Sequence, residues 1–413
     1  MREMKDSGVE WIGEIPATWE LSKIGSIYDE RNEKVSDQDY EPLSVTKQGI
    51  VPQLETAAKT DNGDNRKLIK KNDFVINSRS DRRGSCGISE YDGSCSLINT
   101  VLRPRRNMCN QYYGFVFKSD NFADEYYRWG HGIVNDLWST KWSDMKNIYI
   151  PMPNIEEQKK MAEYLDSKCS QIDVIIEKQM AIIEKLKEYK LSLISEAVTK
   201  GLNKEAELQD SQSDFIGKVP VHWEIMKFGR CITIKSNLVP PDKYKSYPQV
   251  SPDSIEKGSA RLIGFKTVEE SGVISWNHLF CEGQIIYSKI RPLLDKVIIA
   301  PFDGLCSADM YPIETTHNTK FIVYMILSAY FHSQVALVTE NRVKMPKINQ
   351  NELSNILVAL PPINEQEIIA EWLDRKCELI DKTIRERVLL IEQYNEYKKS
   401  LIYEVVTGKK EVQ

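Results

Sequence analysis

The stretch "DSGVEWIGEIPATWE" (Asp6–Glu20) is written a second time, as "DSQSDFIGKVPVHWE" (Asp210–Glu224), about 204 residues later. Both copies carry Ile-Gly, a proline and a closing Trp-Glu at the same relative positions. A second pair follows in the same order, "PNIEEQKKMAEYLDSKCSQID" (Pro153–Asp173) and "PPINEQEIIAEWLDRKCELID" (Pro361–Asp381). A period of roughly two hundred residues is too long for a solenoid unit. The sequence therefore predicts a duplicated domain with pseudo-twofold symmetry.

The segments between the repeats diverge and share only short echoes, such as "DGSCS" (92–96) and "DGLCS" (303–307). Strand-like stretches such as "DFVIN" and "QIIYSKI", with glycine- and proline-rich turns between them, indicate mixed α/β domains. The predicted order is an arm (1–25), a first variable domain (26–150), a segment with a long helix (151–202), a second arm (203–229), a second variable domain (230–358) and a segment with a second long helix (359–413).

Apolar residues recur at heptad spacing in both helical segments, which is typical of two helices packed along a seam. The predicted seams comprise Leu165, Ile172, Ile182, Leu186 and Leu193 with Tyr189, and Leu373, Ile380, Leu390, Tyr394 and Leu401 with Tyr397. Each helix is expected to run about 33 residues, or about 50 Å. The lead "PMPNIEEQ" differs from the Pro-Pro of "LPPINEQ", so the first helix is expected to start at a slightly shifted point. The predicted fold class is α+β, with two α/β domains separated by two long antiparallel coiled-coil helices.

Several kinds of catalytic motif are missing from the sequence. There is no Gly-x-x-x-x-Gly-Lys-Ser/Thr loop, no glycine-rich strand-to-helix turn for a dinucleotide or adenosyl cofactor, and no Asn-Pro-Pro-aromatic quartet for a flipped base. The five histidines and eight cysteines are scattered without metal-ligand spacing. We expect a chain that is not an enzyme by itself and that binds no cofactor or metal.

The location of the protein is predicted from its hydrophobic pattern. No apolar run approaches the roughly 20 residues that span a bilayer, and no apolar stretch follows the charged start "MREMKDSGVE". We therefore expect a cytoplasmic protein without membrane contact. The net charge of -5 argues against indiscriminate coating of nucleic acid, yet it is compatible with a local basic face.

Basic residues gather in the variable domains. Between Arg66 and Arg106 there are about ten Lys and Arg against four Asp and Glu, a surplus that can neutralise phosphates. Arginine can also bind guanine in the major groove, and amide side chains suit adenine. The candidate DNA-binding residues are Arg79, Arg82, Arg83, Arg105, Trp138 and Lys141 in the first variable domain, and Lys289, Arg291, Arg342, Lys344 and Lys347 in the second.

With the Trp-Glu arms, the "EEQKKMAEYLD" and "NEQEIIAEWLD" leads and the long helices, the chain resembles the specificity subunit of a type I restriction-modification system over essentially its full length. The resemblance implies two target recognition domains that each read one half of a bipartite, gapped sequence in double-stranded DNA. It implies that the helices set the spacer between the half-sites. It also implies partners: two methyltransferase subunits that bring S-adenosylmethionine and methylate adenine, and restriction subunits that use ATP and Mg. None of these cofactors is expected on this chain.

Two other functions remain open on the residues alone. Because coiled coils often serve oligomerisation, the chain could be a protein-interaction scaffold without DNA binding. A standalone modification enzyme with an unrecognised site is the third alternative. DNA binding through several phosphates weakens steeply with salt, and this separates it from the scaffold.

Overall fold

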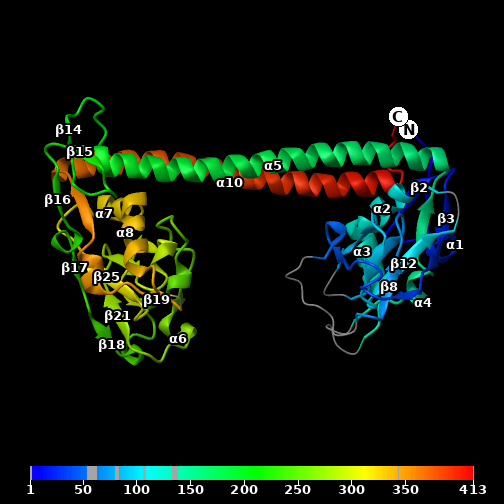
Figure 1. Ribbon diagram of the computed structural model, residues 1–413, viewed down its shortest axis with the longest axis horizontal. Coiled ribbons are helices and arrows are strands. Elements are labelled where there is room, and N and C mark those ends of the chain that lie inside the picture. The colour runs from blue at the N-terminus through cyan, green and yellow to red at the C-terminus, as the bar shows by residue number, and fades with distance from the viewer. Residues whose placement is uncertain are drawn as a thin grey trace. The chain divides into compact units, whose positions relative to one another are not determined.

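The computed structural model describes residues 2–53, 63–79, 83–105, 108–132, 138–342 and 344–412. The chain forms two compact units (Figure 1). The first unit combines Met1–Gln179 with Val388–Gln413, and the second is Met180–Arg387. Each unit therefore contains one end of each of the two long helices.

The repeated arm folds in the same way in both units. In the first unit β1 (Met4–Asp6) pairs antiparallel with β2 (Glu14–Pro16), and in the second β14 (Leu208–Asp210) pairs with β15 (Lys218–Pro220). The residues after Trp-Glu then form β3 (Glu20–Lys23) and β16 (Glu224–Lys227). These strands pair with β13 (Tyr149–Met152) and β26 (Leu357–Leu360), the last strands of their variable domains. Each arm thus closes the domain that follows it.

The first variable domain is built on a sheet with the order β10-β9-β12-β4. Its strands are β4 (Tyr28–Glu30), β9 (Phe74–Asn77), β10 (Cys86–Ile88) and β12 (Asn99–Pro104). Further pairings join β5 (Lys34–Val35), β8 (Arg66–Ile69) and β11 (Gly93–Cys95), and join β6 (Leu43–Thr46) to β7 (Gly49–Pro52). The helices are α1 (Ile24–Ile27), α2 (Asn110–Lys118), α3 (Asp120–Arg128) and α4 (Trp142–Met145).

The second variable domain repeats this topology with the order β23-β22-β25-β17. Its strands are β17 (Thr233–Ile234), β22 (Ile285–Ser288), β23 (Val297–Ile299) and β25 (Met310–Glu314). A second sheet contains β18 (Leu238–Val239), β19 (Pro248–Val250), β20 (Lys266–Thr267), β21 (Asn277–Phe280) and β24 (Gly304–Cys306). The helices are α6 (Val268–Ser271), α7 (Thr319–Ile326), α8 (Ala329–Thr339) and α9 (Gln350–Ser354). In both domains the first, second, third and fourth strands of the main sheet occupy the same places, so the duplication includes the segments whose sequences diverge.

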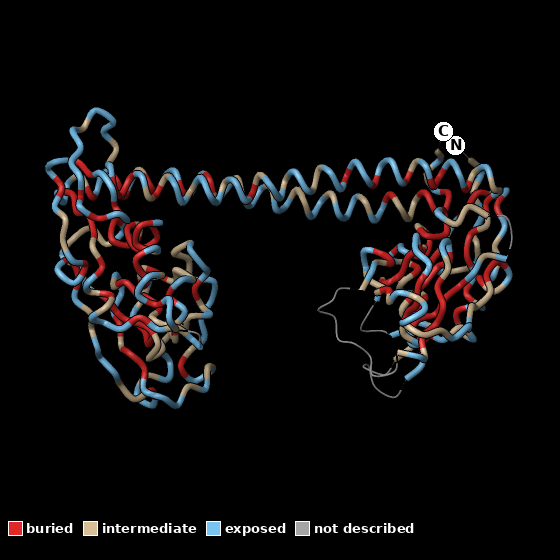
Figure 2. The backbone as a smooth tube through the Cα atoms, in the orientation of Figure 1, coloured by how far each residue is buried: buried red, intermediate tan, exposed pale blue. Residues whose placement is uncertain are grey.

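Each unit has a core that joins its arm, its variable domain and its helix ends (Figure 2). In the first unit Trp19 of the arm and Phe117 of α2 belong to the same buried cluster as Leu165 and Leu401 of the long helices. In the second unit Trp223, Phe321, Ile194 and Leu373 are members of the corresponding cluster. The variable domains are therefore packed on the helices through apolar cores.

The long helices are α5 (Ile155–Lys200, 46 residues) and α10 (Ile363–Val406, 44 residues). The predicted length of about 33 residues is wrong, because both helices are longer. The predicted shift of the first helix start is also wrong, because Ile155 and Ile363 are separated by about 208 residues, the same shift as the repeated motifs. A buried glutamine, Gln158, stands first in the apolar stripe that continues through Met161, Ala162 and Leu165. A search for apolar residues therefore misses the first turns of the helix.

The two helices run antiparallel within each unit, as the fold class predicts. In the first unit Lys398 donates to Asp173 at 2.6 Å, and in the second Lys190 donates to Asp381 at 2.8 Å. From the first ion pair to the second, the residue number rises from Asp173 to Lys190 along one helix and falls from Lys398 to Asp381 along the other, so the helices are antiparallel. These two ion pairs are also equivalent under the repeat, because both members are shifted by about 208 residues.

The deepest stripe of α5 recurs every 11 residues, with Met161, Ile172, Ile183 and Ile194 all buried. Of the predicted seam residues, Leu165, Ile172, Leu373, Ile380 and Leu401 are buried, while Ile182, Leu186, Leu193, Leu390 and Tyr394 are half-buried. Tyr189 and Tyr397 are 57% and 51% exposed, so their assignment to the seam is wrong. An 11-residue period corresponds to 3.67 residues per turn, and a strict heptad drifts off such a stripe.

The described residues include no single helix that is long and apolar enough to cross a membrane. One bent pair, α7 with α8, passes that test by length and composition together. Phe321, Ile322 and Phe331 of this pair are buried in the core of the second unit.

Candidate DNA interface

The repeated motifs form a clamp between each arm and the start of a long helix. The indole N–H of Trp19 donates to the Glu157 carboxylate at 3.2 Å, and that of Trp223 donates to Glu365 at 3.2 Å. Both tryptophans are buried, so these polar atoms need partners inside the protein. The Trp-Glu motif and the Glu-Gln motif are therefore repeated together because they bind each other.

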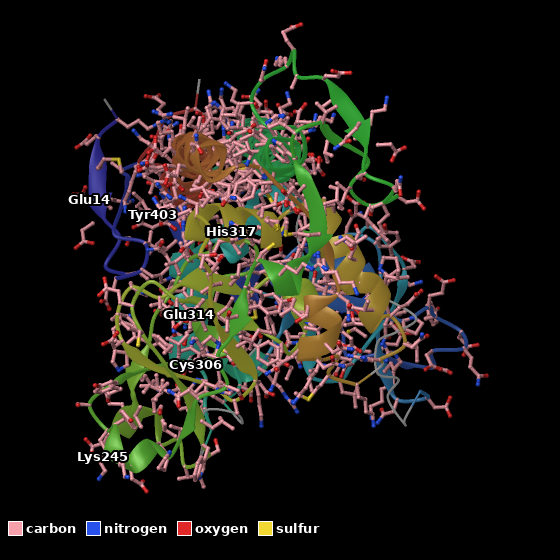
Figure 3. All side chains as sticks on the ribbon, turned by 90° about the vertical axis from the view of Figure 1, so that its left-hand side faces the viewer. Glu14, Lys245, Cys306, Glu314, His317 and Tyr403 are labelled. Atoms are coloured by element: carbon pink, nitrogen blue, oxygen red, sulfur yellow. The ribbon has the colours of Figure 1, made fainter. Side chains whose placement is uncertain are left out.

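The glutamine that follows each of these glutamates holds the variable domain. The Gln158 side chain accepts from the backbone N–H of Cys109 at 2.9 Å, and Gln366 accepts from that of Asn318 at 3.0 Å. Cys109 and Asn318 are the N-caps of α2 and α7. His317, labelled in Figure 3, lies 3.4 Å from the Gln366 amide through its Nδ1. The same buried amide thus anchors the same helix in both units.

Most candidates of the second variable domain meet at the end of β22. Ile290 and Lys347 form an antiparallel bridge, the Ile348 N–H donates to the Lys289 carbonyl at 2.9 Å, and the Arg291 N–H donates to the Pro346 carbonyl at 2.7 Å. We call residues 289–291 with 344–348 the second basic edge. The two segments come together because the loop before α9 returns to the central strand of the sheet.

The first variable domain has the same construction at the end of β9. Arg79 and Ser139 form an antiparallel bridge, and the Thr140 N–H donates to the Ser78 carbonyl at 3.0 Å. We call residues 78–79 with 138–141 the first basic edge. It brings Arg79 together with Trp138 and Lys141, two predicted residues that are distant from Arg79 in sequence. The two edges occupy the same position in the two sheets and carry different side chains.

The cationic side chains of the two edges differ in whether they already have a partner within the protein. Arg79, Lys141, Arg291 and Lys344 are exposed, and none of them has an ion-pair partner among the described residues. By contrast, Lys347 pairs with Asp309 at 2.8 Å, and Lys289 lies over the Tyr311 ring at 5.1 Å. The four exposed cations are the ones most available to phosphates or bases.

Arg342 holds the loop of the second edge. Its guanidinium binds the Glu352 carboxylate of α9 and the Lys347 carbonyl. The hydrogen bond from Arg342 lowers the pKa of Glu352 below its ordinary value. This pairing gives Arg342 a role in shaping the edge, and DNA contact by it stays a prediction.

The other candidates of the first domain lie in different surroundings. Arg83 pairs with Asp124 of α3 and lines the same pocket as Arg79 and Trp138, whereas Arg105 pairs with Asp29 of β4. Arg82 lies outside the described residues. The basic tract counted in the sequence also includes two buried residues, since Arg66 binds Ser94 at 2.8 Å and Lys67 binds Glu30 at 3.1 Å. The net charge of the tract therefore overstates its exposed positive charge.

Trp138 is held in place beside an apolar pocket. Its indole donates to the Tyr127 carbonyl at 3.0 Å, and its ring stacks on Tyr127 with 5.7 Å between centroids. The pocket is also lined by Arg79, Phe117 and Tyr126 and encloses about 20 Å³, the space of one water molecule. Trp138 thus forms a rigid wall next to the exposed guanidinium of Arg79.

Sequence reasoning missed two features of the second domain. Ile274 and Trp276 precede β21 and are 92% and 58% exposed, which suits contact with bases or a partner. A search for basic residues passes over them. Arg291 and Met345 adopt left-handed backbone conformations, with φ of 46° and 49°. Such strain clusters at functional sites, and only the folded backbone reveals it.

The comparison with protein families accounts for this repeated geometry. The model described as "Type I restriction modification DNA specificity domain" matches residues 16–188 and again residues 220–390. The chain belongs to this family. Each matched segment contains one basic edge, one clamp and the larger part of a long helix, so the resemblance found in the sequence is confirmed.

Relatives within this family are similar to the chain to different extents. The type I restriction enzyme EcoDI specificity subunit of Escherichia coli is 35% identical over 260 residues, which cover 59% of this chain and 58% of the relative. This match spans less than two thirds of that relative. The putative type I restriction enzyme MjaX specificity subunit of Methanocaldococcus jannaschii is 23% identical over 96% of this chain and 95% of its own length.

Solved structures share the fold of the family. A chain from a study of assembly and conformational transition of the type I R-M system has a TM-score of 0.74 at 12% identity, covering 96% of this chain and 99% of that one. The HsdS subunit from Thermoanaerobacter tengcongensis has a TM-score of 0.54 at 14% identity, with 96% and 98% covered. The two-domain tandem fold fits a specificity subunit better than an unrelated coiled-coil scaffold.

Proposed function

We propose that this chain is the DNA specificity subunit of a type I restriction-modification system and that each basic edge reads one half of a bipartite, gapped target. The observation that carries the proposal is the equivalent position of the two edges at the ends of β9 and β22, with different side chains on a repeated frame. One frame that presents two different sets of polar groups suits the recognition of two different sequences.

In this proposal the chain itself performs no catalysis. Two methyltransferase subunits supply S-adenosylmethionine and methylate adenine in the DNA, and restriction subunits supply ATP- and Mg-dependent steps. The absence of nucleotide and methyl-donor motifs from the sequence supports this division of labour. The complex would act on double-stranded DNA in the cytoplasm.

The decisive experiment maps adenine methylation at single-base resolution in a host that expresses the chain with its cognate methyltransferase. A second host expresses the methyltransferase alone. We expect a gapped two-part motif only when the chain is present. Methylation of the same motif without the chain, or no motif in either host, would remove the proposal.

Exchange of residues 26–150 for the corresponding domain of another family member tests whether each variable domain recognises its half-site independently. Only one half of the methylated motif should change, because the other basic edge is untouched. A change in both halves would contradict separate recognition by the two domains.

A further inference from the structure

A β-hairpin of the second variable domain reaches the long helices. The Ile263 N–H donates to the Ser254 carbonyl at 2.8 Å, and the Glu256 N–H donates to the Arg261 carbonyl at 3.0 Å. We call residues 254–263 the hairpin. Its tip contains Ala260 with φ of 56°, a left-handed conformation that non-glycine residues adopt at a cost. Surrounding contacts must therefore hold the tip in this shape.

The tip of the hairpin binds α10 at a carboxylate that also binds α5. The Arg261 guanidinium donates to Asp381 of α10 at 2.7 Å, and Lys190 of α5 donates to the same carboxylate at 2.8 and 2.9 Å. Ala260 packs on the apolar core that includes Leu373 and Cys377 of α10. The carboxylate is only 18% exposed, so water competes weakly for its hydrogen bonds.

The other side of the hairpin touches the loop that carries the second basic edge. The Gly258 N–H donates to the Asp295 carbonyl at 3.3 Å. Asp295 ends the short turn Pro292–Leu294, and Arg291 of the edge starts it. The Asp295 carboxylate is itself held by His332 of α8 at 2.8 Å. A continuous set of contacts thus leads from the helix carboxylate to the edge.

The hairpin provides a further point of attachment for the domain. Closer to the start of α10 the domain is held by the clamp at Glu365 and Gln366, and Lys320 and Tyr324 of α7 bind Asp374 at 2.6 and 2.7 Å. Asp381 lies 16 residues beyond Glu365 along the helix, about 24 Å away at 1.5 Å per residue. Because the hairpin contact lies farther from the clamp than the contacts at Asp374, its loss would allow the domain to tilt more on the helices.

The first unit lacks this arrangement within its described residues. Its equivalent carboxylate, Asp173, binds Lys398 at 2.6 Å, and no arginine of the described part of the first variable domain reaches it. Asp173 is 58% exposed. The repeated ion pair is therefore common to both units, and Arg261 is an addition to the second.

We propose that Arg261 is a positioning residue that fixes the second basic edge relative to the long helices and thereby restricts the length of spacer that the complex accepts. This inference rests on the proposed function. Successive base pairs are separated by about 3.4 Å along the helix axis. A domain that is free to tilt could reach a half-site displaced by one such step.

The test compares methylation by the complete complex at sites whose half-sites are unchanged and whose spacer is one base pair longer or shorter. Arg261→Ala should raise the rate at these sites about tenfold relative to the rate at the normal spacer, a factor that corresponds to about 1.4 kcal/mol. Arg261→Lys keeps the charge and should restore much of the discrimination. The half-site sequences should stay the same, which separates positioning from base reading.

Arg261, Asp381 and Arg385 line one cleft of about 550 Å³. Arg385→Ala is the matched control, since Arg385 makes no ion pair to the hairpin among the described residues. It should leave the spacer preference unchanged. Unaltered spacer preference in a folded Arg261→Ala complex would overturn the inference, and so would an equal effect of Arg385→Ala.

If the wild-type complex shows no gapped motif, the proposed function itself fails, so the failure of the proposed function is distinguishable from the failure of this inference. Circular dichroism confirms that the variants are folded.

Discussion

At the scale of residues, side chains that are repeated in both units differ from unrepeated ones in burial and in hydrogen bonding. Trp19, Glu157 and Gln158, with their counterparts in the second unit, are buried or half-buried and bind one another or the backbone. Arg79 and Arg291 point into solvent without a carboxylate partner among the described residues. Hydrogen bonds fix the first group, whereas no such contact in the described part of the chain constrains the second group, which the proposed function assigns to DNA binding.

Exposed and paired arginines of the first domain should contribute unequally to DNA binding. Arg79→Ala is expected to weaken binding about tenfold and Arg83→Ala less than about threefold, because Asp124 already compensates the charge of Arg83. Fluorescence anisotropy of labelled target DNA with the assembled methyltransferase complex, at several salt concentrations, measures both affinity and salt dependence. Equal losses for the two variants would contradict the importance of the first basic edge.

Gly408 follows α10 and should be the least replaceable glycine of the repeated frame. Its φ is +74°, and a Cβ there would lie 2.5 Å from Pro16 and 2.8 Å from Trp19. Gly217 has φ of +72° with open space around it, so Gly217→Ala measures the backbone cost alone. We expect Gly217→Ala to lower the free energy of unfolding by about 1–2 kcal/mol and Gly408→Ala by about 1–3 kcal/mol more. Urea unfolding followed by circular dichroism measures the free energy of unfolding of both variants. Equal losses for Gly217→Ala and Gly408→Ala would show that the close packing around Gly408 is unimportant.

At the scale of elements, ion pairs join the long helices to each other and join one helix to a loop. The pair of Asp173 with Lys398 and that of Asp381 with Lys190 fix the antiparallel register of the long helices in each unit. On α8, His332 ties the loop of the second basic edge through Asp295. The hydrogen bond that His332 donates to Asp295 raises the pKa of His332, while burial and the charge of Lys257 act in the opposite direction.

This histidine should make the stability of the second unit depend on pH. A raised pKa in the folded state means that the stabilisation is fully present below the unfolded value of about 6.5 and is lost as the pH rises through the folded value. His332→Gln should therefore lower the urea midpoint more at pH 6 than at pH 9. The same loss at both pH values would show that the ion pair contributes nothing. Lys257→Gln serves as a control that alters the opposing charge.

At the scale of the whole molecule, α5 and α10 are continuous helices that pass from one unit into the other. Each variable domain is fixed to them by a clamp and an apolar core. In the proposed function, a change in the length of both helices is therefore expected to change the spacer between the two half-sites.

Insertion of one turn into both helices should lengthen the DNA spacer. Four residues after Gln179 and four after Arg387 add about 6 Å and a rotation of about 40°. One or two base pairs of DNA correspond to about 3.4–7 Å and about 34–70°, so we expect the methylated motif to gain one or two unspecified bases with the same half-sites. An unchanged spacer would show that the helices do not set it. A four-residue insertion in the 203–207 loop is the control.

The sequence by itself determined the duplication, the order of arms, variable domains and long helices, and the family, because repeated motifs and apolar patterns are local properties. Only the tertiary structure decided which candidate cations are already paired with a carboxylate, since partners such as Asp124, Glu352 and Asp309 are distant in sequence. It likewise showed the 11-residue stripe, the common topology of the diverged domains and the attachment of Arg261 to Asp381. These features depend on which backbone segments lie side by side, and that is fixed by the packed fold rather than by the residues of one segment.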